Sequence, residues 1–443
     1  MQGVSRSYLS KMGPDSKECE SSGILRFLLI FAFIVDARFA CIISLPGILG
    51  EWTSSNWSKE LVCIIAAVIF ISYFIRYRSI VLNRLSCFLP VYLLLLLTVC
   101  VIEIVYSMKV MGSPLSASVK SSEVAYFILA LPLLIQMIID GSCKKMMNLL
   151  TVIATFCAVA MLAQSIYFTA TGGILFSAMT NTTGTDVAIR EFGIRFSPPG
   201  GLLTFTAIYS VIAALFLSED LRSRFPYIAS GTLLVSAIVT VYQTRMEDIA
   251  LIGSLLFAII LCAENGKLSK GLKRILVALL VGLVLGMGSL ESFFSSFSAT
   301  NSAYSGSTTI RAYAYTYYFE KFLNYPLFGF GSLPSTSSLL HGNGTAYISD
   351  VGIVGLSAQW GIMFIALYAI FFWRMIFVYW RTKDAVGVFE RALMLAVIIY
   401  LLLTSATLCC FSPALGIRVV IALALFELIN SQNKGERKVD VDA

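Results

Sequence analysis

The run SCFLPVYLLLLLTVCVIEIVY, residues 86–106, decides the fold, because Glu103 is its only charged residue. A helix needs about 20 predominantly apolar residues to cross roughly 30 Å of hydrocarbon. Runs of this kind recur along the 443 residues, of which 58% are hydrophobic and 13% charged, with a mean hydropathy of +0.84. Soluble domains average about 25% charged residues, and their exteriors must be largely polar. The chain is therefore predicted to be an integral membrane protein and not a soluble enzyme.

About twelve apolar blocks are expected to span the bilayer as helices, because backbone amides in lipid must be satisfied within the segment. The expected spans are residues 24–48, 61–75, 86–106, 124–139, 147–168, 200–217, 226–242, 247–262, 274–289, 351–379, 388–408 and 412–430. A tight hairpin or a re-entrant turn is expected at 409–417. The predicted fold class is an all-α integral membrane protein, with residues 1–443 forming one polytopic bundle of about twelve transmembrane helices.

Basic residues lie in short clusters between the apolar blocks, a pattern typical of topology signals. About twenty of them fall on one side of the predicted bundle and about nine on the other, so the richer side is expected to be cytoplasmic. Both termini then lie inside, and the two longest loops, residues 169–199 and 290–350, lie outside. Because the net charge of +7 is dispersed in this way, no nucleic-acid partner is predicted. Function is expected at the outer face, on the long loops.

Charged residues inside predicted spans are costly and are expected to pair with other helices. Asp36, Arg38, Glu103 and Arg418 are of this kind, and the sequence does not identify their partners. The ten cysteines lie mostly within spans and show no metal-ligand spacing, so they are interpreted as small buried hydrophobic residues. No metal site and no cofactor is predicted.

Two outer segments contain residues suited to chemistry. His341, the only histidine, lies in the second long loop and can exchange a proton near neutral pH. The alternative is a loop histidine without a role. Arg245 lies in a short outer turn, where its forked donors can bind a phosphate. In the alternative interpretation it pairs with Glu247 or Asp248, or anchors the helix at the interface.

Arg311 opens the aromatic segment RAYAYTYYFEKFL, which is predicted to form a helix along the membrane surface. Its aromatic residues, Tyr315 and Tyr318 among them, favour the interface and also offer flat faces for sugar rings. Arg190 and Arg195 lie in the other long outer loop, either as solvated charges or on the same side as His341. Several arginines beside one histidine suit a substrate that carries a diphosphate.

The histidine segment resembles the motif of Wzy-type O-antigen polymerases and O-antigen ligases. In this family a histidine is followed, after a fixed spacing, by two glycines three apart. His341, Gly352 and Gly355 keep that spacing, whereas the residue directly after the histidine, usually polar, is Gly342.

Three further segments resemble the same family in order and in sidedness. Arg245 is similar to the family's arginine at the outer end of a helix. Arg311, followed by the turn PLFGFG at 326–331, resembles the arginine and glycine turn that opens the large periplasmic loop. The spacing from Arg190 to Gly201 resembles the arginine–glycine pattern of polymerase loops.

The resemblance implies a glycosyltransferase of the bacterial inner membrane with two long periplasmic loops. Its activity would be the polymerisation of O-antigen, capsule or exopolysaccharide repeat units carried on undecaprenyl diphosphate in the membrane lipid. His341 would activate the acceptor hydroxyl, while Arg311 and Arg245, helped by Arg190 or Arg195, would hold the diphosphate without a metal. A chain-length regulator is a further possible partner.

Two alternatives stay open on the sequence alone. A ligase would use the same histidine motif to transfer the finished glycan to lipid A–core. A secondary transporter would also have about twelve spans, but such proteins bind substrate near the midplane between repeated halves. No internal repeat is apparent in this sequence. The two long, arginine-bearing outer loops favour the polymerase.

Overall fold

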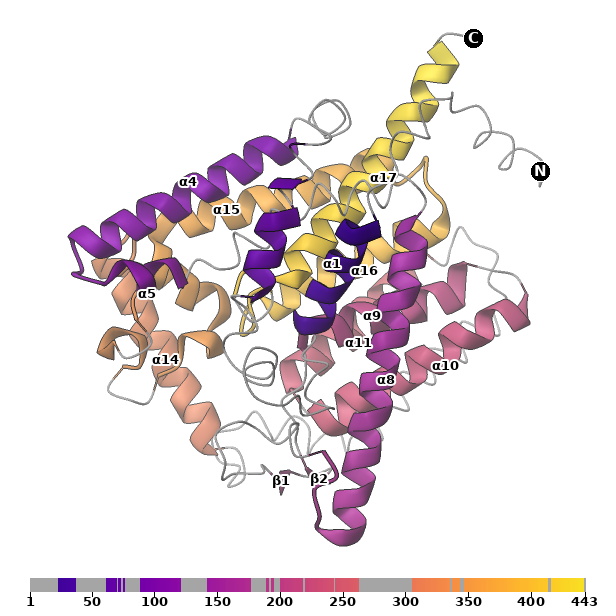
Figure 1. Ribbon diagram of the computed structural model, residues 1–443, viewed down its shortest axis with the longest axis horizontal. Helices are drawn as coiled ribbons and strands as arrows, with labels where there is room; N and C mark the ends of the chain where they lie inside the picture. Colours follow the sequence, from indigo (N-terminus) through magenta and orange to yellow (C-terminus); the bar gives the residue numbers. More distant parts are fainter. Residues whose placement is uncertain are drawn as a thin grey trace.

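The computed structural model describes residues 23–36, 61–69, 71–72, 75, 88–120, 142–176, 189–190, 193–194, 200–217, 220–242, 244–262, 305–334, 337–342, 346–412 and 416–441. The helices in this part are α1 (Gly23–Asp36), α4 (Phe88–Lys109), α5 (Leu115–Lys120), α8 (Ser142–Thr171), α9 (Gly200–Phe216), α10 (Leu221–Ala237), α11 (Arg245–Cys262), α14 (Ser305–Asn324), α15 (Gly352–Thr382), α16 (Val388–Thr404) and α17 (Ile417–Val441) (Figure 1). The π-helix η4 (Ile238–Tyr242) extends α10, and the 3-10 turns η6 (Ser338–Leu340) and η7 (Ile348–Asp350) precede α15.

Among the described residues, four helical segments are long and apolar enough to cross a membrane: α4, residues Met147–Thr171 of α8, α10 continued by η4, and α15. α9 is also apolar but shorter. Large hydrophobic side chains stand exposed on the outer faces of these helices, among them Val91 and Leu94 on α4 and Phe156 on α8. Such faces are costly in water and stable in lipid. The prediction of a helical, multi-pass membrane protein is therefore confirmed.

Most expected spans that fall on described residues coincide with helices. The expected spans 86–106, 200–217 and 351–379 correspond to α4, α9 and α15 within a few residues. The expected spans 124–139 and 274–289 lie outside the described residues. The number of twelve spans therefore stays a prediction.

The first long loop contains a short β-hairpin, which leaves the all-helical character of the bundle unchanged. Ile189–Arg190 (β1) pairs antiparallel with Gly193–Ile194 (β2), so the backbone groups of the loop find partners in each other. β2 contacts α8 and η4. The loop also starts later than residue 169, because α8 continues to Thr171.

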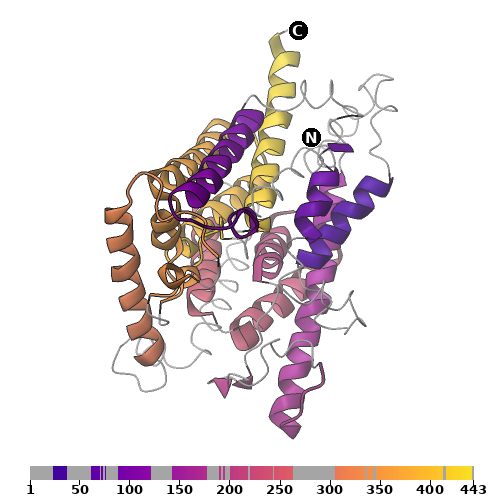
Figure 2. The same ribbon diagram turned by 60° about the vertical axis from the view of Figure 1, so that its left-hand side comes forward.

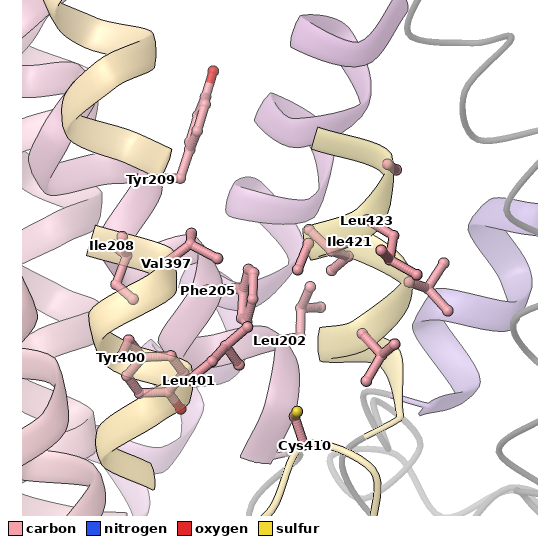
Figure 3. Close-up of a cluster of buried hydrophobic side chains, with 14 of the residues drawn as sticks. Leu202, Phe205, Ile208, Tyr209, Val397, Tyr400, Leu401, Cys410, Ile421 and Leu423 are labelled. Carbon is pink, nitrogen blue, oxygen red and sulfur yellow. The ribbon is translucent and has the colours of Figure 1, made fainter. Parts of the chain in front are cut away.

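The core of the bundle is built from α9, α16 and α17. Leu202 and Phe205 of α9 face Leu401 of α16 and Ile421 and Leu423 of α17 (Figure 3). Around them, α11 packs along α16, while α8 and α10 pack along α9. α15 contacts α16 and α17 and brings α4 against the same core. α14 packs against α15 in a second, smaller buried cluster, which includes Ala314, Tyr318 and Ala358.

Several helix ends meet at one end of this bundle. α9, α11 and α17 begin where α16 ends, because one side chain from each meets there. The first turn of α15 joins them through the Ile353 N–H, which donates to the Ser405 carbonyl at 2.9 Å. We call this end of the bundle, together with α14 and the segment 337–352, the loop end. Arg245, Arg311, His341, Gly352 and Gly355 belong to segments at this end, whereas Arg195 lies outside the described residues.

α15 is broken at Gly361, and the turn at residues 326–331 fills the break. Gly361 has φ +61° and ψ −151°, a conformation that glycine adopts without steric cost. At such a break, backbone carbonyl and N–H groups lose their partners within the helix and need new ones inside a membrane protein. Three backbone hydrogen bonds supply these partners: Phe330 N–H to Ala358 O (2.9 Å), Gly331 N–H to Gln359 O (2.8 Å) and Ile362 N–H to Pro326 O (2.8 Å).

The connection between α16 and α17 turns back into the bundle. Cys409, Cys410 and Phe411 are buried there, and the Phe411 ring lies 5.3 Å from the ring of Phe371 in α15. The connection begins earlier than the expected 409–417, because α16 ends at Thr404. Whether it is a tight hairpin or a re-entrant turn stays a prediction. The irregular backbone is tolerated because protein covers it.

Candidate functional site

α14 is the helix expected along the membrane surface. It runs across the ends of α4 and α15 instead of continuing their direction (Figure 1), and the turned view in Figure 2 places it at the rim of the molecule. The helix begins at Ser305, ahead of Arg311. Arg311, Tyr315 and Tyr318 follow one another at spacings of four and three residues, so they lie on one face.

The Arg311 face of α14 is turned toward the segment that carries His341. The hydroxyl of Tyr315 donates to the carbonyl of Ala406, just beyond α16. The hydroxyl of Tyr318 donates to the carbonyl of Leu340 at 2.5 Å, with the carbonyl of Ala346 at 3.4 Å. Because Tyr318 is 0% exposed, the expectation that it contacts a sugar is corrected: it holds the histidine segment in place.

His341 lies in a closed backbone loop. Its N–H donates to the carbonyl of Ser338 at 3.2 Å, and its own carbonyl accepts from the N–H of Ala346 at 3.0 Å. The imidazole is half-buried and meets the ring of Tyr347 edge to face, with the ring centroids 5.9 Å apart. The loop therefore presents a partly accessible imidazole on a fixed backbone.

The glycine after the histidine has a steric reason. Gly342 has φ +40°, in the left-handed region that favours glycine. A Cβ at this position would lie 2.9 Å from the Cβ of Ala346 and 3.3 Å from the ring of Tyr317. A side chain at this position would therefore strain the backbone and crowd Ala346 and the ring of Tyr317.

The glycine pair after the histidine lies at two close backbone approaches. Gly352 has φ +46°, and a Cβ there would overlap the carbonyl of Ser405. A Cβ at Gly355 would lie 2.6 Å from the carbonyl of Ile348. These two glycines let the first turn of α15 pack directly against the end of α16 and against η7.

Arg311 has unused hydrogen-bonding capacity. Its side chain is half-buried, and its Nε is buried without a hydrogen-bond partner in the described part of the chain. Burial raises the pKa of Tyr315, the positive charge of Arg311 lowers it, and the negative charge of Asp350 raises it again. The net effect is upward, so the phenol of Tyr315 stays protonated and keeps donating to the end of α16. The Arg311 guanidinium thus lies near a neutral phenol, with the carboxylate of Asp350 also acting on that phenol. A guanidinium with a free donor is suited to an anion.

Arg245 is the first residue of α11, directly after the short turn that the sequence predicts. Its side chain lies outside the described atoms. The carboxylate of Glu247, a partner considered for it, receives the guanidinium of Arg418 at 2.6 Å and the hydroxyls of Tyr400 and Thr204. Glu247 is therefore engaged by three other helices.

The described part of the structure contains two buried ion pairs whose partners could not be identified from the sequence. Arg418 carries one of the intramembrane charges expected to find a partner, and that partner is Glu247. Arg374 of α15 binds Glu427 of α17 through two hydrogen bonds of 2.6 and 3.0 Å. In the sequence, Glu247 lies two residues after Arg245, so a local ion pair was the partner considered for it. Its actual partner, Arg418, is brought close only by the packing of α17 against α9 and α16.

The remaining predicted charges are placed only in part. Glu103 is fully buried on the face of α4 that packs toward α15. Asp36 ends α1 with its side chain outside the described atoms, and Arg38 lies beyond the described residues, so their partners stay open. Arg190 lies in β1, whose partner strand contacts α8 and η4, whereas α14 contacts α15 and η7. Arg190 and Arg311 therefore belong to different parts of the loop end, and Arg195 lies outside the described residues.

No protein-family model matches the chain, and no curated protein sequence matches it. Within the described residues, no group of three or more histidine, cysteine, aspartate or glutamate side chains is placed to hold a metal ion. The candidate site therefore consists of His341, Arg311 and the tyrosines of α14, with Arg245 at the head of a neighbouring helix.

Proposed function

We propose that this protein is a membrane glycosyltransferase that polymerises lipid-linked polysaccharide repeat units. The donor is a glycan on undecaprenyl diphosphate, and the loop end faces the periplasm. The bundle has about twelve spans in the bacterial inner membrane, with both termini in the cytoplasm. The charge distribution of the loops supports this orientation.

One observation carries the proposal: a single helix, α14, brings a phosphate-binding group and a proton-transfer group together. Arg311 and Tyr318 share one face of α14, and Tyr318 holds the backbone next to His341. A diphosphate leaving group needs a cation, and an acceptor hydroxyl needs a base. In the proposal, Arg311 supplies the cation and His341 the base.

In the proposed reaction the acceptor hydroxyl attacks the anomeric carbon of the donor sugar. The bond from that carbon to the diphosphate oxygen breaks, and its electron pair leaves with undecaprenyl diphosphate. His341 takes the hydroxyl proton, while Arg311 and Arg245 stabilise the charge that grows on the diphosphate. Arg190 and Arg195 extend the binding surface, and the arginines supply the positive charge that a metal would otherwise provide.

The transporter alternative has one observation in its favour, the broken helix α15. Transporters use such breaks to expose backbone groups to a substrate or an ion. In α15 the groups at the break are bonded to residues 326–331, so they are occupied by the protein itself. The break is better explained as the anchor of α14 than as a transport site.

The deciding experiment is a product assay with purified protein and an undecaprenyl-diphosphate-linked repeat unit, run with and without lipid A–core. A ladder of longer lipid-linked glycans without lipid A–core is expected. Product that appears only with lipid A–core identifies a ligase, and no product with matched sugars and folded protein removes the glycosyltransferase proposal.

Site variants then test the assignment. His341→Ala and Arg311→Ala are each expected to lower turnover by about 10²–10³-fold, the cost of losing one transition-state contact. Arg222 is an exposed arginine in the first turn of α10, at the end of the bundle opposite the loop end. Arg222→Ala is therefore the matched control and is expected to retain activity. Full activity in both Arg311→Ala and Arg245→Ala would remove the arginine assignment.

A further inference from the structure

Glu247, at the loop end, binds the side chains of three residues from three other helices. It is 0% exposed and lies in the first turn of α11, two residues after Arg245. Its Oε1 binds the guanidinium of Arg418 at 2.6 Å. Its Oε2 accepts from the hydroxyl of Thr204 at 3.3 Å and from the hydroxyl of Tyr400. One carboxylate thus ties the head of α11 to α9, α16 and α17.

The cluster is held by geometry as well as by charge. The guanidinium of Arg418 also lies over the ring of Tyr400, 5.3 Å from its centroid. Both members of the ion pair are 0% exposed, so neither charge is compensated by solvent and each depends on the other. The Tyr400 and Thr204 hydroxyls orient the carboxylate, which a simple ion pair leaves free to rotate.

The same stretch of α16 reaches the histidine unit. Tyr400 binds Glu247. Five residues further along the chain, the Ser405 carbonyl accepts from the N–H of Ile353, in the first turn of α15. The next carbonyl, that of Ala406, accepts from Tyr315 of α14. Five residues of helix span about 7.5 Å. The end of α16 is therefore a short bridge between the head of α11 and the face of α14 that carries Arg311.

We propose that Glu247 is a positioning residue that fixes the distance between the two arginine-bearing helices, α11 and α14. This role rests on the proposed function, in which Arg245 and Arg311 grip one diphosphate. Two cations can bind one anion only if their backbones keep a set separation. The carboxylate sets it by holding α11 to Tyr400 near the end of α16, six residues before Ala406, whose carbonyl holds α14.

Paired substitutions separate positioning from simple stability. Removing one charge strands the other in the interior, whereas removing both is close to neutral. Glu247→Leu/Arg418→Met therefore folds but loses the bonds to Tyr400 and Thr204. Glu247→Gln/Arg418→Met keeps an oxygen that accepts both hydroxyls. Turnover is expected to fall about 100-fold in the leucine variant, as displaced catalytic groups do, and to recover in the glutamine variant with the KM for the acceptor unchanged.

A matched control exists in the second buried ion pair. Arg374 and Glu427 bind each other with the same chemistry, further along α15 and α17 from the loop end. Arg374→Met/Glu427→Leu is expected to keep wild-type turnover. If this control loses turnover as strongly as Glu247→Leu/Arg418→Met, the effect is structural and the proposal is overturned. The proposal is also overturned if turnover of the leucine variant returns to the wild-type value under conditions that restore its thermal stability.

A distance measurement tests the inference without any activity. Spin labels at Met246→Cys and Tyr313→Cys report the separation of α11 and α14 by double electron–electron resonance, on a background from which accessible native cysteines are removed. One narrow distance is expected in the parent protein and in the glutamine variant, and a broadened or shifted one in the leucine variant. An unchanged distribution in the leucine variant overturns the positioning role. If the parent protein makes no polysaccharide, the proposed function fails while this readout still decides the geometry.

Discussion

Arg311 and Glu103 are charged residues with buried side-chain atoms that make no hydrogen bond within the described residues, and Arg391 is a further one. Arg418 and Arg374 each bind a carboxylate. The Nε of Arg311 and both carboxylate oxygens of Glu103 are buried and have no hydrogen-bond partner in the described ranges of the chain. An unsatisfied buried polar group costs about 1–3 kcal/mol. For Arg311 this cost is consistent with a site that is completed by its substrate.

The shape of the Arg311 side chain is expected to matter as well as its charge. Arg311→Lys keeps the positive charge but replaces a planar fork of donors with a point charge. Turnover of lipid-linked substrate is expected to fall at least tenfold, a loss of about 1.4 kcal/mol in transition-state binding, with thermal stability unchanged. Wild-type kcat/KM in the lysine variant would show that charge alone suffices.

Glu103 allows a test of stability. Glu103→Leu is expected to raise the free energy of unfolding by about 1–3 kcal/mol, because it removes a buried carboxyl group without a described partner. Glu427→Leu is the comparison and is expected to lower it by about 3–5 kcal/mol, since Arg374 is left unpaired. Thermal unfolding in detergent measures both. Destabilisation in Glu103→Leu would reveal a partner beyond the described residues.

At the scale of elements, α14 acts as a clamp on the histidine loop. Tyr318 binds the backbone on both sides of His341. The turn at residues 326–331, which follows α14, bonds to the break of α15. Burial raises the pKa of Tyr318, with smaller contributions in the same direction from Tyr317 and Asp350. The phenol therefore stays a neutral donor across physiological pH, and the clamp does not depend on pH in that range.

Loosening the clamp is expected to release the loop. Tyr318→Phe removes the hydroxyl that serves the carbonyls of Leu340 and Ala346, at a cost of about 1–3 kcal/mol for the buried acceptors. Hydrogen exchange in the described part of 337–350 is expected to rise and turnover to fall, with donor binding retained. Tyr313→Phe on the exposed side of α14 is the control. Unchanged exchange in Tyr318→Phe would contradict the clamp.

The junction between α14 and α15 depends on Gly361. A Cβ there would overlap the carbonyl of Leu327, so Gly361→Ala combines a strained backbone with a clash. Gly112 has a similar φ of +66°, but a Cβ there meets nothing within 4 Å. Gly112→Ala is expected to cost roughly 1–2 kcal/mol from conformation alone, and Gly361→Ala roughly 1–3 kcal/mol more. Equal losses in thermal unfolding would show that the contact is unimportant.

At the scale of the whole molecule, the loop end and the opposite end differ in what they carry. The loop end gathers α14, the His341 loop and the heads of α9, α11 and α17. The opposite end holds the α9–α10 and α15–α16 turns, with basic residues such as Arg222 and Lys383. The charge rule would then predict that the opposite end faces the cytoplasm.

The proposed orientation can be checked by labelling in intact cells. Tyr313→Cys and Leu221→Cys are both on exposed side chains, 41% and 73% accessible, at opposite ends of the bundle. A membrane-impermeant maleimide that passes the outer membrane is expected to label Tyr313→Cys, and Leu221→Cys only after the inner membrane is opened. The described native cysteines give little background, since all are buried except the half-buried Cys63. Reversed labelling would place the loop end in the cytoplasm.

Local composition was enough to establish the membrane class and the main helices, because apolar runs such as 86–106 can be stable only as helices in lipid. It also predicted a helix over the aromatic segment after Arg311, where α14 lies. It also singled out Arg311 and His341 as chemically suited residues. The partner of Glu247, the burial of Tyr318 and the break at Gly361 depended on the tertiary structure. Each of them joins segments far apart in the chain, and which helices become neighbours is set by packing across the whole bundle, a property that no local stretch of sequence contains.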